Sequence, residues 1–149
     1  MLCVAMLCVT MVCITFPRVS LAQKESDIRM IVVVNTDNAA ASISREQLSS
    51  VFLKKPTSWG IDHPVVPIDR ERDSKVREVF SKTIHHRPTD AVEKYWQIQI
   101  FSGQDVPPAE RTSDAAVLAA VRANPKGIGY VKANTPLGAN VKVLTVTDL

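Results

Sequence analysis

The residues with the clearest chemical potential lie around Ser74. Several basic side chains gather there within a short stretch of sequence, namely Arg70, Arg72, Lys75 and Arg77. An apolar strand pattern ends just before this stretch, and a helical pattern begins at about Ser74. A helix start leaves backbone N–H groups without partners, and such groups attract anions. Arginine adds a planar fork of donors that matches an oxyanion. The pattern therefore predicts a small-anion site.

The same residues also have a purely structural interpretation, which the pattern leaves open. Asp73 or Ser74 can cap the helix with a side-chain oxygen. The arginines can be solvated, or they can pair with the acidic residues near them in sequence, which are Glu71, Asp73 and Glu78. Asp73 also carries negative charge into the predicted anion site, and this repels an anion unless its side chain turns away or a proton is shared.

The elements that must position this cluster begin with strands. Residues 28–34 form a near-continuous β-branched run, which predicts a central strand covered on both faces. Residues 65–68 predict a short strand, and Pro67 places it at a sheet edge or at a strand end. Residues 127–131 and 141–146 predict two further strands. One face of the last strand is predicted to carry Val141, Val143 and Thr145.

Two helices are predicted before the middle of the chain. Ser44 and Gln47 make a capping-box pattern, and apolar residues follow at helical spacing until about Leu53. The next helix begins at residue 73 or 74. Its apolar residues recur at i, i+3, i+4, i+7 and i+8, which predicts one buried face. They are Val76, Val79, Phe80, Thr83 and Ile84.

Two more helices follow, and their alternation with strands predicts an α/β fold. One begins at residues 88–90, ends at Gly103 and carries an apolar face of Val92, Tyr95, Trp96 and Ile100. It is apolar on more than one side, so it either packs between other elements or offers a protein-binding surface. A loop over residues 105–111 leads to a last helix, which Thr112 or Ser113 caps.

Three segments connect the chain with a known family. They are Val51-Phe52-Leu53-Lys54 with Trp59, Arg70-Glu71-Arg72-Asp73-Ser74 with Phe80, and Gly127-Ile128-Gly129-Tyr130-Val131. From about Ile28 to Val131 the chain resembles the phosphate-binding proteins of phosphate ABC transporters, within the type II periplasmic binding protein superfamily. The resemblance implies a single lobe of that α/β fold, with a central mixed sheet flanked by helices.

The resemblance also implies ligand residues. At the second segment the family carries an Arg, a Gly-Ser-Gly-Thr turn and a helix with a Phe. Arg70, Ser74 and Phe80 fall in register with these, so the resemblance implies that Arg70 and Ser74 are phosphate ligands. The chain differs from the turn at three positions, which are Asp73, Lys75 and Val76.

Two further residues complete the candidate ligand set. Arg77 is an extra cation one turn inside the helix, where it can compensate for Asp73. Tyr130 reaches the ligand cleft or packs in the core. The candidate ligand-binding residues are therefore Arg70, Ser74, Lys75, Arg77 and Tyr130. The glycines on either side of Ile128 are expected to let the backbone pass close to a neighbouring element.

Proteins of that family close two lobes on their ligand, whereas this chain resembles only one. Asn35 falls where the family's chain crosses from the first lobe into the second. We therefore expect the chain to begin where the second lobe begins and to lack the other half of the phosphate cage. One lobe alone would bind weakly, and a homodimer or a partner protein would restore the missing wall.

The N-terminus has the features of a targeting segment. Residues 1–16 are apolar except for Thr10 and Thr15, and Ser20-Leu21-Ala22 fits signal-peptidase cleavage. The run is shorter than the roughly 20 residues of a membrane span. We expect a signal peptide over residues 1–22 and a periplasmic domain over residues 23–149, without a stable membrane span after cleavage. The alternatives are an uncleaved anchor and, because no Lys or Arg precedes the run, a start codon further upstream.

Cysteine usage and charge exclude several classes of function. All three cysteines, Cys3, Cys8 and Cys13, lie in the targeting segment, so the mature domain would have no disulfide and no thiolate metal site. The net charge is +3. Since no basic stripe or aromatic platform is present, nucleic acid is not an expected partner.

No enzyme motif or metal motif stands out either. His85 and His86 point about 100° apart on a helix, so they are not expected to share a metal ion, and as cations they would suit the helix end. No nucleophile elbow, glycine-rich phosphate loop or HExxH pattern is present. We therefore expect neither an enzyme nor a cofactor.

Two functional hypotheses follow. The first is a periplasmic solute-binding-like protein that binds phosphate or a similar small oxyanion and works with an ABC-type transporter. The second is a non-transport interaction or sensory module of the cell envelope, which keeps the fold without tight ligand binding. The pairing of Arg70 with Ser74 favours the first hypothesis. The missing lobe and the change from Gly-Thr to Lys75-Val76 favour the second.

Overall fold

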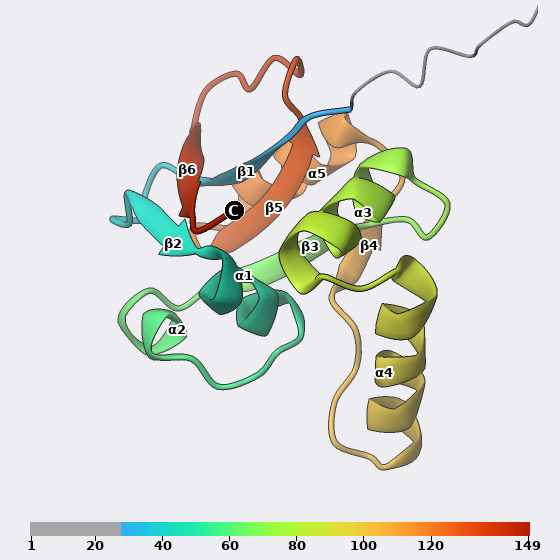
Figure 1. Cartoon of the computed structure of the whole chain (residues 1–149). Coiled ribbons are helices and arrows are strands. Elements are labelled where there is room, and N and C mark those ends of the chain that lie inside the picture. The colour runs from blue at the N-terminus through green and yellow to red at the C-terminus, as the bar shows by residue number, and fades with distance from the viewer. Residues whose placement is uncertain (1–27) are drawn as a thin grey trace, which may run out of the picture.

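The fold is a six-stranded mixed β-sheet with helices on both of its faces (Figure 1). It comes from a computed structural model that describes residues 28–149. The signal peptide predicted over residues 1–22 and the first residues of the predicted domain lie outside the described residues. The predicted fold class, an α/β lobe with a central mixed sheet, is confirmed.

The sheet has the strand order β2-β6-β1-β5-β3-β4. The strands are β1 (Met30–Asn35), β2 (Ser42–Ser44), β3 (Val66–Arg70), β4 (Ala109–Arg111), β5 (Gly127–Lys132) and β6 (Val141–Thr147). β1 lies antiparallel to its neighbours β5 and β6. β3 lies parallel to β4 and β5, and β2 lies parallel to β6. Within this sheet β1 thus opposes the direction shared by the other strands.

The helices are α1 (Arg45–Phe52), α2 (Ser58–Asp62), α3 (Lys75–Phe80), the π-helix η1 (Ser81–His85), α4 (Thr89–Phe101) and α5 (Asp114–Ala123). The predicted capping box is confirmed, because Ser44 Oγ accepts from the Gln47 N–H and the Gln47 side chain accepts from the Ser44 N–H. Ser113, rather than Thr112, caps α5 by accepting from the Ala116 N–H. Among the described residues, no helix has the length and apolar character needed to cross a membrane.

The core lies in two layers, one on each face of the sheet. Val32 and Val34 of β1 pack with buried residues of α1, α3 and η1, whereas Val33 packs on the opposite face with α5. All three valines are at most 2% exposed. The prediction of a central strand covered on both faces is therefore confirmed. Figure 1 shows α5 behind the sheet, with α1 and α3 in front of it.

Several local predictions are wrong. β4 lies in a segment predicted as a loop, and the short elements β2 and α2 were not predicted. Of the two positions predicted for Pro67, the sheet edge is wrong, because β3 lies between β5 and β4, whereas the strand end is correct, because Pro67 is the second residue of β3. Pro67 is tolerated near the start of β3, since pairing with β4 begins only at Ile68.

The predicted buried faces of β6 and α4 are only partly correct. Val141 is buried, but Val143 on the same face is 47% exposed, and Leu144 provides the buried contact on the other face. In α4, Val92 and Trp96 are buried against Leu53, whereas Ile100 is exposed. Ile100 lies in the last turn of α4, which extends beyond that contact (Figure 1).

β5 and α5 approach each other closely because glycine occupies two positions of β5. A Cβ atom on Gly127 would lie 2.8 Å from Val121 Cα and 3.0 Å from the Asn124 carbonyl oxygen. A Cβ atom on Gly129 would lie 2.7 Å from Val117 Cγ1. The prediction that these glycines permit close backbone approach is confirmed.

We predict that Gly127→Ala lowers the free energy of unfolding by about 1–3 kcal/mol, because the added methyl group meets backbone atoms that cannot turn away. Urea denaturation of the purified protein measures this loss. Gly60→Ala is the matched control, since its Cβ atom would meet only the Thr57 methyl group, at 3.2 Å. Equal stability of the wild type and Gly127→Ala would contradict the prediction.

Candidate functional site

The predicted site residues occupy the end of β3 and the start of α3. Arg70 is the last residue of β3, Ser74 precedes α3, and Lys75 and Arg77 lie in its first turn. Arg70 and Arg77 are 6% and 3% exposed, whereas Lys75 is exposed. The structure thus separates two buried guanidinium groups from one solvated ammonium group.

Arg70 is directed toward the start of α5. Its Nη1 forms an ion pair with Asp114 Oδ1, and its Nη2 donates to the Thr112 carbonyl oxygen at 3.3 Å. Asp114 Oδ2 in turn accepts from Thr135 Oγ1 at 2.9 Å. Arg70 Nε is buried and has no hydrogen-bond partner among the described residues. Such an unsatisfied buried donor costs about 1–3 kcal/mol, so this atom is a potential contact for a ligand.

Arg77 ties α3 to the two parallel strands beneath it. Its Nη1 donates to the Arg70 carbonyl oxygen at 2.7 Å and to Glu110 Oε1 at 2.5 Å. Its Nη2 lies 3.5 Å from Asp69 Oδ2. Asp69 and Glu110 are register partners in β3 and β4, so one guanidinium bridges both strands.

Tyr130 is fully buried beneath α3. Its ring stacks on Phe80 with the centroids 4.0 Å apart, and its hydroxyl donates to Asp69 Oδ1. The Arg70 N–H donates to the same carboxylate oxygen at 2.8 Å. Tyr130 therefore packs in the core, and it also holds the Asp69 carboxylate in place next to Arg70.

Burial is the largest influence on the pKa values of Asp69 and Tyr130. It raises the pKa of Asp69 above its ordinary value of 3.8, although Arg77 and the hydrogen bond from Tyr130 oppose that shift. Burial and the neighbouring Asp69 raise the pKa of Tyr130 well above its ordinary value of 10.0. The phenol is therefore neutral at neutral pH and acts as a hydrogen-bond donor to Asp69.

The arginines are paired with acids other than those predicted from the local sequence. Their partners are Asp69, Glu110 and Asp114. Glu78 instead binds Lys75 at 3.1 Å and Lys82 at 2.7 Å, which lowers the pKa of Glu78. Because Glu110 and Asp114 come from β4 and α5, only the folded chain brings them to the arginines. The acidic first turn of α5 was the one local signal for Asp114.

Ser74 lies at the surface next to the cluster of Arg70, Arg77 and Tyr130. Its side chain does not cap α3, and it has no hydrogen-bond partner in the part of the chain that the structure describes. Its carbonyl oxygen accepts the first helical bond, from the Glu78 N–H at 3.1 Å. Of the predicted ligands, Arg70, Arg77 and Tyr130 thus share one buried cluster, while Ser74 and Lys75 lie at its surface.

Arg72 connects the loop that carries Ser74 with α4. Its Nε lies 2.9 Å from Glu93 Oε1, and its Nη2 lies 3.7 Å from Asp90 Oδ1. The Arg72 side chain is 63% exposed, so these pairs contribute little stability. They do show that this arginine is directed toward α4 rather than toward the Arg70 cluster.

The two neighbouring histidines differ in environment. His85 Nδ1 lies 2.8 Å from Ser49 Oγ, and the His85 ring meets the edge of Phe80. Burial, with a smaller contribution from Arg87, lowers the pKa of His85 from 6.5 to about 4. His85 is therefore neutral, which corrects the expectation of a cation at this helix end. Residues 28–149 contain no group of three side chains placed to hold a metal ion.

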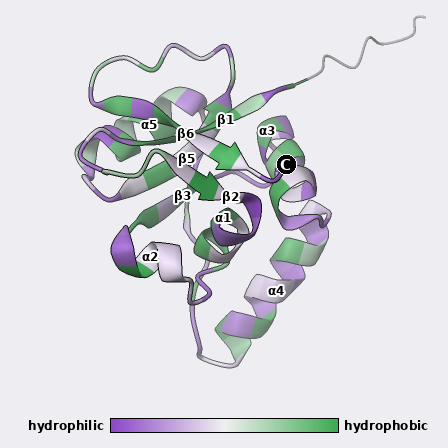
Figure 2. Ribbon diagram, turned by 60° about the vertical axis from the view of Figure 1, so that its left-hand side comes forward, coloured by the Kyte–Doolittle hydropathy of each residue, from purple (hydrophilic) through white to green (hydrophobic). Residues whose placement is uncertain are grey.

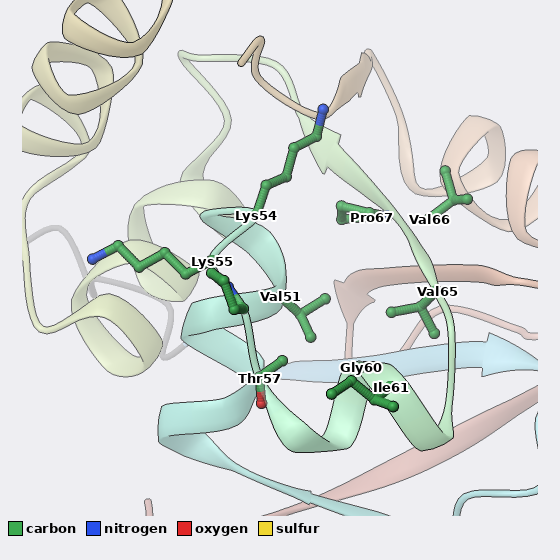
Figure 3. A pocket seen from close by; sticks show the side chains of 10 residues that line it. Val51, Lys54, Lys55, Thr57, Gly60, Ile61, Val65, Val66 and Pro67 are labelled. Atoms are coloured by element: carbon green, nitrogen blue, oxygen red, sulfur yellow. The ribbon is translucent and has the colours of Figure 1, made fainter. Parts of the chain in front are cut away.

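A hollow of about 580 Å³ lies near the opposite end of β3 from Arg70 (Figure 3). The end of α1, the loop after it, α2 and the start of β3 line it. None of the predicted ligand residues contributes to it. It is therefore separate from the Arg70 cluster.

Solved structures with a similar fold are substrate-binding proteins of phosphate transport. One is described as a putative phosphate ABC transporter substrate-binding protein with bound phosphate from Clostridium perfringens (TM-score 0.60, 17% identity, 78% of this chain and 44% of that chain). A second is PstS from Borrelia burgdorferi (TM-score 0.61, 16% identity, 81% of this chain and 48% of that chain). A third is an ABC-type phosphate transport receptor from Vibrio cholerae (TM-score 0.55, 17% identity, 80% of this chain and 46% of that chain).

These similarities show the fold alone, which this chain shares with part of each of these substrate-binding proteins. The chain spans less than half the length of each of these proteins. No protein-family model and no curated protein matches the sequence. At this level of identity the likeness concerns the arrangement of helices and strands, and the ligand has to be argued from the site itself.

We predict that His85 makes the protein less stable as the pH falls from 6.5 to 4. In this window the unfolded chain binds a proton that the folded His85 does not, so acidification favours unfolding by up to roughly 3 kcal/mol. His85→Gln removes the titrating group and keeps an amide that can bond with Ser49. Urea denaturation at a series of pH values should show a flatter stability profile for the variant. Parallel profiles would contradict the prediction.

Proposed function

We propose that this chain is a periplasmic solute-binding protein for phosphate or a similar small oxyanion, acting with an ABC-type transporter. The observation that carries the proposal is the buried Arg70 at the end of β3, whose Nε has no partner among the described residues. The fold supports it, since the similar structures are binding proteins of phosphate transport by their descriptions. The targeting segment predicted over residues 1–22 supports the compartment.

In this proposal the oxyanion contacts Arg70, Ser74 and Lys75. Arg70 Nε and the Ser74 hydroxyl are donors without partners in residues 28–149, and Lys75 supplies an exposed positive charge. Arg77 and Tyr130 act behind them as positioning residues. Arg77 donates to the Arg70 carbonyl oxygen, and Tyr130 donates to Asp69, which accepts from the Arg70 N–H.

A specific observation favours the second candidate, a non-transport interaction or sensory module of the envelope. Arg70 and Arg77 already bind Asp114 and Glu110, so an oxyanion has to compete with carboxylates for the same guanidinium groups. Competition of this kind lowers affinity. It suits a domain that keeps the fold and binds an envelope protein instead of a solute.

We predict that the purified protein, expressed from its full sequence, binds phosphate, sulfate or molybdate in isothermal titration at low salt. Ser74→Ala should weaken binding about five- to tenfold, because the loss of one hydrogen bond is worth about 1 kcal/mol. Ser58→Ala is the matched control, since this exposed serine also lies at the start of a short helix, but that helix is α2, which does not contribute to the Arg70 cluster. Arg70→Ala should abolish binding.

Asp114→Asn separates the two candidates. It removes the carboxylate that competes for Arg70 and keeps a side chain of the same shape, so oxyanion affinity should rise if Arg70 binds the ligand. Circular dichroism checks that each variant is folded. Absence of heat with all three anions, from a folded wild type and a folded Asp114→Asn, would eliminate the oxyanion proposal and favour the interaction module.

A further inference from the structure

The last turn of α4 carries apolar side chains into solvent. The first half of α4 packs on the core through Val92 and Trp96, but its C-terminal end projects from the body (Figures 1 and 2). The exposed large apolar side chains at this end and in the following loop are Ile98 (64%), Ile100 (49%), Phe101 (90%) and Val106 (59%). These four residues are named here the α4 tip.

The α4 tip carries no charge of its own. From Gln97 to Gln104 the sequence has only apolar and uncharged polar residues. The next acidic residue, Asp105, already pairs with Lys54 at 3.2 Å. The tip can therefore be buried in an interface without leaving an unpaired charge, which is a major cost of burying polar surfaces. A neutral surface also does not repel its own copy.

A hollow lined mainly by apolar side chains lies on the same molecule. Figure 3 shows Val51, Val65 and Pro67 around the cavity of about 580 Å³, while the amines of Lys54 and Lys55 extend away from it. Ile61 (81% exposed) and Val66 (44% exposed) add apolar surface to its lining. Its lining is mainly aliphatic, so it suits an apolar side chain rather than a charged ligand. It is named here the β3 hollow.

The tip and the hollow are neighbours on one side of the molecule. Lys54 lines the hollow, and its Nζ binds Asp105, the residue before Val106. A knob and a hollow that lie side by side are self-complementary about a two-fold axis that passes between them. Two copies related in this way place each knob in the other's hollow and close the assembly.

We propose that the partner of this surface is a second copy of the same chain. In the resulting two-fold homodimer, the α4 tip of each copy fills the β3 hollow of the other, with Phe101 as the central anchor. Exposed aromatic side chains that enter a pocket dominate the binding energy of such interfaces. This inference does not depend on the oxyanion proposal.

Sedimentation velocity of the protein, expressed from its full sequence and purified, tests the proposal over a range of micromolar concentrations. We expect a reversible dimer, and we expect Phe101→Ser to weaken dimerisation at least tenfold. Phe101 is 90% exposed, so this substitution leaves the fold intact. Leu149→Ser is the control, because Leu149 is 73% exposed at the C-terminus, far from the α4 tip in both views. A monomer at all concentrations, or assemblies that grow beyond a dimer, would overturn the proposal.

A mixing experiment tests the exchange of knob and hollow. Ile61→Glu places a charge at the hollow and leaves the tip intact, whereas Phe101→Ser removes the knob and leaves the hollow intact. Each variant alone should be monomeric. A mixture of the two restores one intact knob-in-hollow contact per heterodimer, so dimers should reappear with lower affinity than in the wild type. A mixture that stays as monomeric as its components, beside a dimeric wild type, would overturn the proposed geometry.

Discussion

The burial of charge at the end of β3 is the constraint on which the rest of the structure depends. Asp69, Arg70 and Arg77 are all nearly inaccessible to water, and an unpaired charge there would be strongly destabilising. Each is satisfied by a group from a different element: Tyr130 from β5, Glu110 from β4 and Asp114 from α5. The pairing of Glu110 with Arg77 adds to the backbone pairing of β4 with β3, which involves only three residues of each strand. Arg77 also connects α3 to the sheet, because it lies in α3 and pairs with Asp69 of β3 and Glu110 of β4.

That constraint also limits what the candidate site can bind. The guanidinium groups that would attract an oxyanion are the ones that the fold needs for its own carboxylates. A ligand therefore gains the unpartnered Arg70 Nε and the free Ser74 hydroxyl, but it competes with Asp114 for the remainder of Arg70. Lys75 and Ser74 lie at the surface of the cluster, where water weakens electrostatic contacts with a ligand. These two effects act in the same direction and favour modest affinity.

The sequence predicted those features whose causes are local. The valine run of β1, the Ser44–Gln47 capping box and the glycines of β5 each have a cause within a few residues. The ion pairs of Arg70 with Asp114 and of Arg77 with Glu110 could not be predicted, because these two acids lie 44 and 33 residues away in sequence. Local sequence offered nearer acids, and geometry rather than proximity in sequence selected the partners. The prediction that Ile100 is buried was wrong for a related reason. Helical periodicity gives the face on which a residue lies, but it does not show how far along the helix the neighbouring element extends.

The two candidate surfaces lie at opposite ends of β3, and this separation has a functional consequence. The hollow is lined by residues 65–67, whereas Arg70 is the last residue of the strand. At about 3.3 Å per residue, Arg70 lies roughly 10 Å beyond Pro67. The proposed dimer contact and the proposed oxyanion contact therefore use different residues. Dimerisation through the α4 tip and oxyanion binding at the end of β3 are therefore independent proposals, and either can hold without the other.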